Sequence, residues 1–381
     1  MKKTKGFGLL GIIIIIIITA IVSSVATGVI MLNSTVNIDE NNIKDISNDK
    51  ELMDFINVYE TIMDKYYAEI DKEGMLKAAE EGMLDFLGDK YTTYLEDSEY
   101  NSIMDELSAT YSGIGVTIEN NRIVAITSNS PAEKVGLKVN DLLVKVNNQD
   151  VTQMNSEQIS NIIKNSPTNI SLIIKRNDLE LSYNVEKKDL INVAIESKII
   201  ENTHIGYLKI NKFSENLDEQ VSNSLKNLES NAISSLIIDV RNNVGGYLSA
   251  AENTASLFLN YGKIIYSLET SNNTMVYKDE TKEKREYDIV VLINGTSASA
   301  AEILAIALKE SYGATLVGTK SYGKGKVQQI IGDSAKYTFA KWLTPNGECI
   351  DGIGIMPDHI VSNMLGDITD YQLNKAIELL S

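Results

Sequence analysis

The amino-acid sequence predicts a mixed α+β and α/β protein in several parts: an N-terminal transmembrane helix, a helical segment, a β-rich domain and an α/β core. Three patterns support this prediction. A long apolar run follows the first lysines, apolar residues then recur at helical spacing, and short β-type runs finally alternate with helical segments. The chain has 381 residues, which is enough for two or three domains that each bury a core.

The composition excludes several classes of function. The net charge is −17 and no basic stripe is present, so a nucleic-acid partner is not expected. Cys349 is the single cysteine, which excludes an intrachain disulfide and a cysteine-based metal site. The two histidines, His204 and His359, are far apart in the sequence, which excludes a histidine-rich metal cluster. A hydrolase built from this chain must therefore find its general base among few side chains.

Residues 1–32 are predicted to form a short cytoplasmic segment and a membrane anchor. Three lysines precede an uncharged apolar run over residues 7–32, which as a helix would measure about 39 Å against a hydrocarbon core of about 30 Å. A cleaved signal peptide is the alternative, because residues 24–26 resemble a cleavage site, but the apolar run continues past them. The lysines before the run and the acidic residues after it predict a single-pass protein of the cell membrane, with the remaining chain outside the cytoplasm.

A polar linker over residues 33–50 precedes a helical region over residues 51–110. Apolar side chains recur there at steps of three and four residues, namely Leu52, Phe55, Ile56, Tyr59, Ile62 and Met63. Gly88-Asp89-Lys90 interrupts the pattern. We interpret this region as structural, or as the contact of a homodimer, rather than as catalytic.

Residues 111–188 change to short β-type runs, with a helix predicted over 156–164 and a strand over 170–175. The block Ser130-Pro131-Ala132, followed by Gly136-Leu137 and by Asp141 in the next turn, together with this order of elements, resembles a PDZ domain. PDZ domains bind a peptide C-terminus as an added strand and hold its carboxylate with backbone N–H groups of a loop.

The PDZ resemblance implies a peptide-binding site. The residues that it assigns are those of the loop, Gly113, Ile114, Gly115 and Val116, and two on the apolar face of the helix, Ile159 and Ile163. The glycines suit a loop whose backbone approaches an anion closely. The alternative is that these glycines only permit a turn. Asn140 stands where the PDZ pattern usually has glycine, which leaves the peptide specificity open.

Residues 189–362 alternate strands and helices, and residues 363–381 are predicted to form a C-terminal helix. The continuous apolar runs 236–240 and 289–293 are typical of strands buried on both faces, and a helix-favouring segment extends from 297 to 308. Active sites of α/β sheets usually lie at the ends of such strands.

Three motifs follow these strands. The first, residues 239–246, ends in a glycine pair whose N–H groups could converge in an oxyanion hole or could simply form a turn. An ion pair between Asp239 and Arg241 is not expected from the motif. The second, residues 294–302, places serines among small residues where a strand turns into a helix. Ser297 is expected to be the helix N-cap. The third, residues 318–329, has lysines among glycines and alone would suit anion binding as well as catalysis.

Together, and in this order, the three motifs resemble those of the carboxyl-terminal processing peptidases, S41 serine peptidases with a PDZ domain. The resemblance covers residues 77–381 and implies a core of crotonase-like fold. It implies that Ser299 is the nucleophile, that Lys324, 25 residues later, is the general base, and that Gln328 orients the lysine. Backbone N–H groups of Ala300 and of Gly245 or Gly246 would form the oxyanion hole. Val244 replaces the proline that is usual before the glycine pair and removes no catalytic group.

The resulting hypothesis is a membrane-anchored serine endopeptidase that cleaves extracytoplasmic proteins with apolar C-termini and needs no metal or other cofactor. The alternative is a membrane-tethered PDZ scaffold that binds peptides without cleaving them. A penicillin-binding type of enzyme is disfavoured, because neither Ser297 nor Ser299 has a lysine three residues later. A crotonase-like enzyme of small ligands has no cofactor motif to support it.

Overall fold

The computed structural model describes residues 48–282, 285–363 and 368–381. The anchor predicted over residues 1–32, and nearly all of the linker, lie outside this part of the chain. Within the described residues, no helix is long and apolar enough to cross a membrane.

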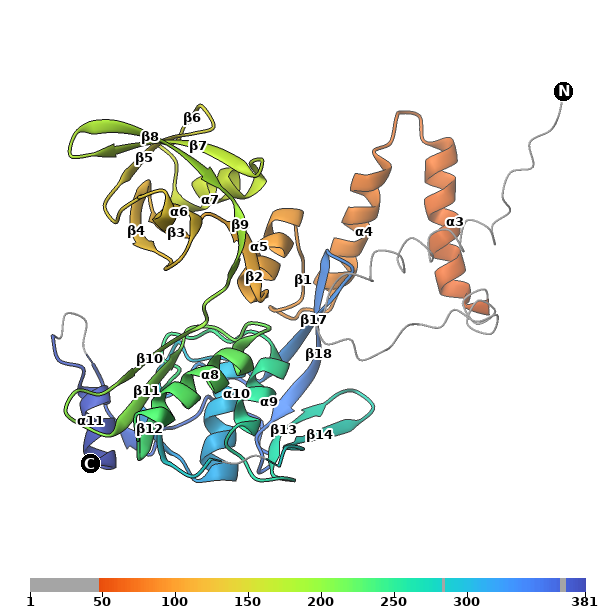
Figure 1. The fold of residues 1–381 in the computed structure, drawn as a ribbon. Coiled ribbons are helices and arrows are strands. Elements are labelled where there is room, and N and C mark those ends of the chain that lie inside the picture. Colours follow the sequence, from red (N-terminus) through yellow and green to blue (C-terminus); the bar gives the residue numbers. More distant parts are fainter. Residues whose placement is uncertain (1–47, 283–284, 364–367) are drawn as a thin grey trace.

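The N-terminal unit consists of helices α3 (Lys50–Lys65), α4 (Lys72–Phe86) and α5 (Asp97–Leu107). Asp49 and Asp71 begin α3 and α4 by accepting a backbone N–H in the first turn. Neither helix buries a residue completely, and Figure 1 shows both projecting away from the rest of the protein. Between α4 and α5 lies a short strand, β1 (Thr93–Tyr94), that the helical pattern did not predict.

The β-rich domain that resembles a PDZ domain is an antiparallel sheet in the order β3-β4-β5-β7-β8, with β6 beside β5. Its strands are β3 (Val116–Glu119), β4 (Arg122–Ile126), β5 (Leu142–Val146), β6 (Gln149–Asp150), β7 (Asn169–Arg176) and β8 (Leu179–Glu186). Helices α6 (Pro131–Lys134) and α7 (Ser156–Asn165) pack on it. Asn140 has a φ of 76°, a left-handed conformation that asparagine tolerates better than most residues, which explains why it can stand in for glycine.

A ribbon of β2 (Thr110–Gly113) and β9 (Lys188–Ile191) joins this domain to the core. The main core sheet has the order β10-β11-β12-β15-β16-β19 and is parallel except for β10. Its strands are β10 (Ile195–Ile199), β11 (Ile205–Ile210), β12 (Ser235–Asp239), β15 (Asp288–Ile293), β16 (Thr315–Gly318) and β19 (His359–Ile360).

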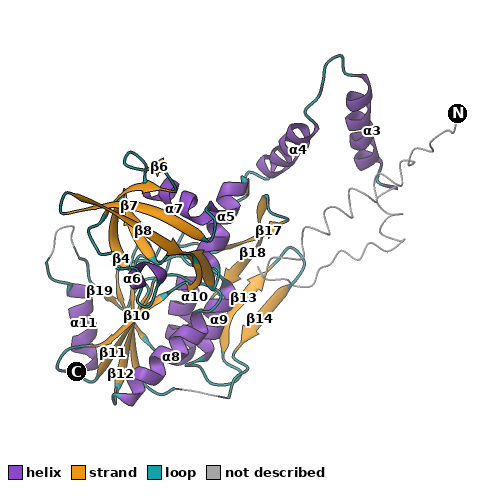
Figure 2. Cartoon of the chain, turned by 45° about the horizontal axis from the view of Figure 1, so that its top comes forward, coloured by secondary structure: helices purple, strands orange, loops and turns teal. Residues whose placement is uncertain are grey.

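Helices cover both faces of this sheet, which explains the continuous apolar runs of its central strands. One face carries α8 (Leu217–Ser230), α9 (Leu248–Ser256) and α10 (Ala300–Ala307), and the other carries α11 (Tyr371–Leu380). Figure 2 shows α11 on the opposite side of β11 and β12 from α8.

A second core sheet contains β13 (Ile264–Glu269), β14 (Thr274–Lys278), β17 (Lys326–Ile331) and β18 (Ala335–Leu343). Strand β1 of the N-terminal unit pairs with β18 in this sheet. The N-terminal unit is therefore attached directly to the strands that follow the lysine motif.

Candidate active site

Ser299 lies at the junction of β15 and α10, where it is the N-cap residue of the helix. Its backbone has a φ of 55° and a ψ of −120°, a conformation that non-glycine residues seldom adopt and that often marks a functional site. The prediction that Ser297 caps this helix is wrong. Its hydroxyl is fully buried and instead donates to the Val240 carbonyl at 2.8 Å, because the loop folds back onto the end of β12.

The Glu302 carboxylate ties the serine motif to the lysine motif. It accepts the backbone N–H of Ser299 and of Lys324, each at 2.9 Å. It also accepts the Gly323 N–H at 2.7 Å and the Ser321 hydroxyl at 2.5 Å, and it is fully buried. No role for Glu302 was predicted from the sequence. The available signal was a single carboxylate in the first turn of an otherwise wholly apolar helix.

Lys324 lies in the loop that precedes β17, with its carbonyl held by the indole Nε1–H of buried Trp342 at 2.8 Å. Burial lowers the pKa of the Lys324 amine, and the neighbouring charge of Lys336 lowers that pKa further, whereas Glu302 opposes the shift. The Lys324 Nζ lies 5.2 Å from the ring centre of Tyr91, in the N-terminal unit. Among the described residues, no hydrogen bond joins Lys324 Nζ to Ser299 Oγ, so the dyad stays a prediction.

The glycine pair contacts the serine motif. Gly245 and Gly246 have φ angles of 108° and 145°, which favour glycine, and a Cβ atom added to Gly245 would lie 2.9 Å from Ser299 Cβ. The Gly245 N–H donates to Asn243 Oδ1 at 2.8 Å. In the described part of the chain, the N–H groups of Gly246 and Ala300 have no such partner, so this pair is the better candidate for the predicted oxyanion hole.

Gln328 lies on β17 and donates from Nε2 to the Thr338 hydroxyl on β18 at 3.2 Å. The described residues show no hydrogen bond between Gln328 and Lys324. The orienting role of Gln328 therefore stays a prediction.

The PDZ residues occupy different environments. Gly113 belongs to β2, Ile114 and Gly115 form the connection to β3, and Val116 begins β3, which is an edge strand of the sheet. A Cβ atom on Gly115 would lie 2.2 Å from Ser130 Cβ, so this glycine allows close packing as well as a turn. Ile114, Ile159 and Ile163 are buried in the domain core. Their role in peptide binding stays a prediction.

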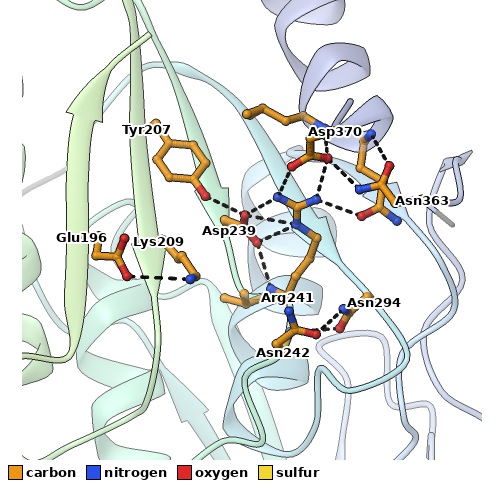
Figure 3. Close-up of polar contacts among 12 residues, drawn as sticks. Glu196, Tyr207, Lys209, Asp239, Arg241, Asn242, Asn294, Asn363 and Asp370 are labelled. Atoms are coloured by element: carbon orange, nitrogen blue, oxygen red, sulfur yellow. Dashed lines mark hydrogen bonds and ion pairs between the residues drawn. The ribbon is translucent and has the colours of Figure 1, made fainter. Parts of the chain in front are cut away.

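Arg241 and Asp239 form a buried ion pair, contrary to the sequence analysis. Strand β12 ends at Asp239, and the chain turns there so that Asp239 Oδ1 accepts the Arg241 N–H at 2.9 Å. The guanidinium then reaches Asp239 at 2.6 Å and Asp370, the N-cap of α11, at 2.9 Å (Figure 3). Burial opposes ionisation of Asp370, but hydrogen bonds, foremost that from Arg241, lower its pKa to about 2. This network attaches the C-terminal helix α11 to the end of β12, next to the motif that contains Gly245 and Gly246.

Replacing Arg241 by methionine should lower the free energy of unfolding by about 3–5 kcal/mol, because the buried Asp239 carboxylate would lose its cation. Urea unfolding of the two proteins measures the loss. Lys209→Met is a matched control, since the Lys209–Glu196 pair is more exposed and is expected to contribute less than about 1 kcal/mol. Equal losses in the two variants would contradict this account of the network.

Comparisons with known proteins agree with this architecture. The profile of peptidase family S41 matches residues 204–361, that of the PDZ domain matches 122–176, and that of the activating protease CtpB N-terminal domain matches 19–99. The carboxy-terminal processing protease CtpA of Bacillus subtilis is 35% identical over 90% of this chain and 75% of its own length. CtpB of the same organism is 34% identical over 82% of this chain and 68% of its own.

A solved structure, the photosystem II D1 C-terminal processing protease, superposes with a TM-score of 0.50 and 22% identity. The match covers 86% of this chain and 90% of the other. At this identity the likeness shows a shared fold.

Proposed function

This chain belongs to the carboxy-terminal processing proteases, a family of S41 serine peptidases, and from that premise we propose that it cleaves proteins through Ser299 and Lys324. The observation that carries the assignment is the buried Glu302 carboxylate. It accepts the backbone N–H of both residues, so the two motifs are held together by one side chain.

In the proposed reaction, neutral Lys324 removes the proton of Ser299 as the serine oxygen attacks a peptide carbonyl. The N–H groups of Ala300 and Gly246 stabilise the oxyanion, each contributing about 2.7–4 kcal/mol. Lys324 then returns the proton to the leaving amine, and water hydrolyses the acyl-enzyme. An ordinary lysine has a pKa near 10.4 and is a poor base at neutral pH, so the lowered pKa of Lys324 supports this role.

The proposal extends to substrates and location. Apolar C-termini would bind as an added strand at β3, the edge strand of the PDZ sheet, beside the Gly113–Val116 loop. The apolar run 7–32 would anchor the protein in the cell membrane, with the catalytic part outside the cytoplasm. The exposed apolar residues of α3 and α4 would support a homodimer.

Labelling of Ser299 by a fluorophosphonate, as a function of pH, tests this proposal against a non-catalytic scaffold. The labelling rate should rise with pH, because only deprotonated Lys324 can accept the serine proton. Lys336→Gln removes a positive charge that lowers the Lys324 pKa, so the rise should move to higher pH. Lys341→Gln, an exposed lysine on the same strand, is the control. A protein that is not labelled at Ser299 would support the scaffold.

A further inference from the structure

We propose that Asp89 and Thr338 are positioning residues that orient the amide of Gln328 for its interaction with Lys324. The inference rests on the proposed Ser299–Lys324 chemistry. It makes the loop between α4 and β1 part of the catalytic apparatus, although the sequence pattern there showed only an interrupted helix.

The Asp89 carboxylate is well defined by its partners. Oδ1 accepts the Lys326 ammonium at 2.9 Å, and Oδ2 accepts the Thr92 hydroxyl at 3.0 Å and the Thr338 hydroxyl. Burial opposes ionisation of Asp89, but hydrogen bonds from Thr338, Lys326 and Thr92 lower its pKa to about 2. The group is therefore an ionised carboxylate at neutral pH and can only accept hydrogen bonds.

This charge determines how the next two groups bond. A threonine hydroxyl has one proton, and beside an ionised carboxylate Thr338 must donate that proton to Asp89. The Thr338 oxygen can then only accept from Gln328, so the amide nitrogen of Gln328 faces Thr338 at 3.2 Å. The Gln328 carbonyl oxygen has no partner among the described residues. It remains available to accept a hydrogen bond from the Lys324 amine.

Four more contacts place the same loop beside Lys324 and the strands that follow it. The ring centre of Tyr91 lies 5.2 Å from Lys324 Nζ and 5.9 Å from Lys326 Nζ. Thr92 accepts the Thr338 backbone N–H at 3.1 Å, and Thr93 pairs with Lys336 in the sheet. The N-terminal loop is therefore fixed against β17 and β18, the strands that carry Gln328 and Thr338 (Figure 1).

Thr338→Val tests the proposal in the full chain, because valine keeps the shape of threonine and removes the hydroxyl. The substrate is a fluorogenic peptide whose C-terminal residue is apolar and carries a free carboxylate. We expect kcat to fall about tenfold with KM unchanged, because the loss of one hydrogen bond to a charged group has about this effect. Thr338→Ser should restore most of the activity. Asp89→Asn should also lower kcat, because an amide can donate to Thr338 and no longer fixes its direction.

A double-mutant cycle separates positioning from a general structural defect. In a Gln328→Ala background, Thr338→Val should cause no further loss of kcat. An undiminished kcat in both Thr338→Val and Asp89→Asn would overturn the proposal. If Thr338→Val lowered kcat equally in the wild-type protein and in the Gln328→Ala background, the proposal would also be overturned. Ser299→Ala separates the two proposals, because activity that survives this substitution refutes the proposed Ser299–Lys324 chemistry, whereas the Thr338 and Asp89 variants test only the positioning of Gln328.

Discussion

Replacement of Ser299 by alanine should reduce peptide turnover by at least about 10⁴-fold, because the acyl-enzyme could no longer form. Alanine and serine both have a Cβ atom, so the conformational strain at a φ of 55° is the same for either residue. The fold and the unfolding midpoint of the protein should therefore change little. Lys324→Arg should be as inactive as Lys324→Ala, since a guanidinium stays protonated and cannot serve as a base. Steady-state kinetics on the fluorogenic peptide measure each loss.

Lys320 provides the control for the lysine variants. It is an exposed residue four positions before Lys324 in the same loop, and Lys320→Arg should keep nearly wild-type turnover. Turnover that survives in either Ser299→Ala or Lys324→Ala would refute the catalytic assignment.

Glu302→Gln should lower both stability and activity. In the variant, an amide nitrogen would face backbone N–H groups that donate to the Glu302 carboxylate in the wild-type protein. These buried donors would then lose their acceptor. We expect the free energy of unfolding to fall by about 2–4 kcal/mol. We also expect turnover to fall by about 100-fold, the effect of displacing a catalytic group by about 1 Å.

Glu219→Gln, at an exposed position of α8, is the matched control for this change and should be nearly neutral. Urea unfolding and peptide turnover test both variants. If Glu302→Gln unfolded like the control, the carboxylate would not join the two motifs as described.

Several parts of the fold could be predicted because they depend on local patterns. The spacing of apolar residues over 51–107 predicts helices, and the structure has α3, α4 and α5 there. The apolar runs 236–240 and 289–293 predict strands buried on both faces, and the structure has β12 and β15 there. The expectation that Asp239 and Arg241 form no ion pair was wrong, because residues two positions apart on extended backbone point to the same face. Where a strand ends is decided by the turn that follows, and here Asp239 itself accepts the N–H that closes this turn.

Long-range contacts could not be predicted in this way. Asp89 and Thr338 are 249 positions apart, and the pairing of β1 with β18 leaves no periodic trace in either segment. The same applies to the links between Arg241 and α11 and between Glu302 and the Lys324 loop.

The residue types of the proposed chemistry and their order can be read from the sequence: a serine among small residues, a lysine among glycines 25 residues later and a glycine pair before both. The scarcity of histidine and cysteine, which could otherwise replace them, can be read there too. That Glu302 holds the two motifs together and that Asp89 reaches Gln328 through Thr338 is visible only in the folded structure. Side-chain chemistry is a local property of the chain. Burial, which lowers the Lys324 pKa, and hydrogen bonds between distant segments arise only when these segments pack together.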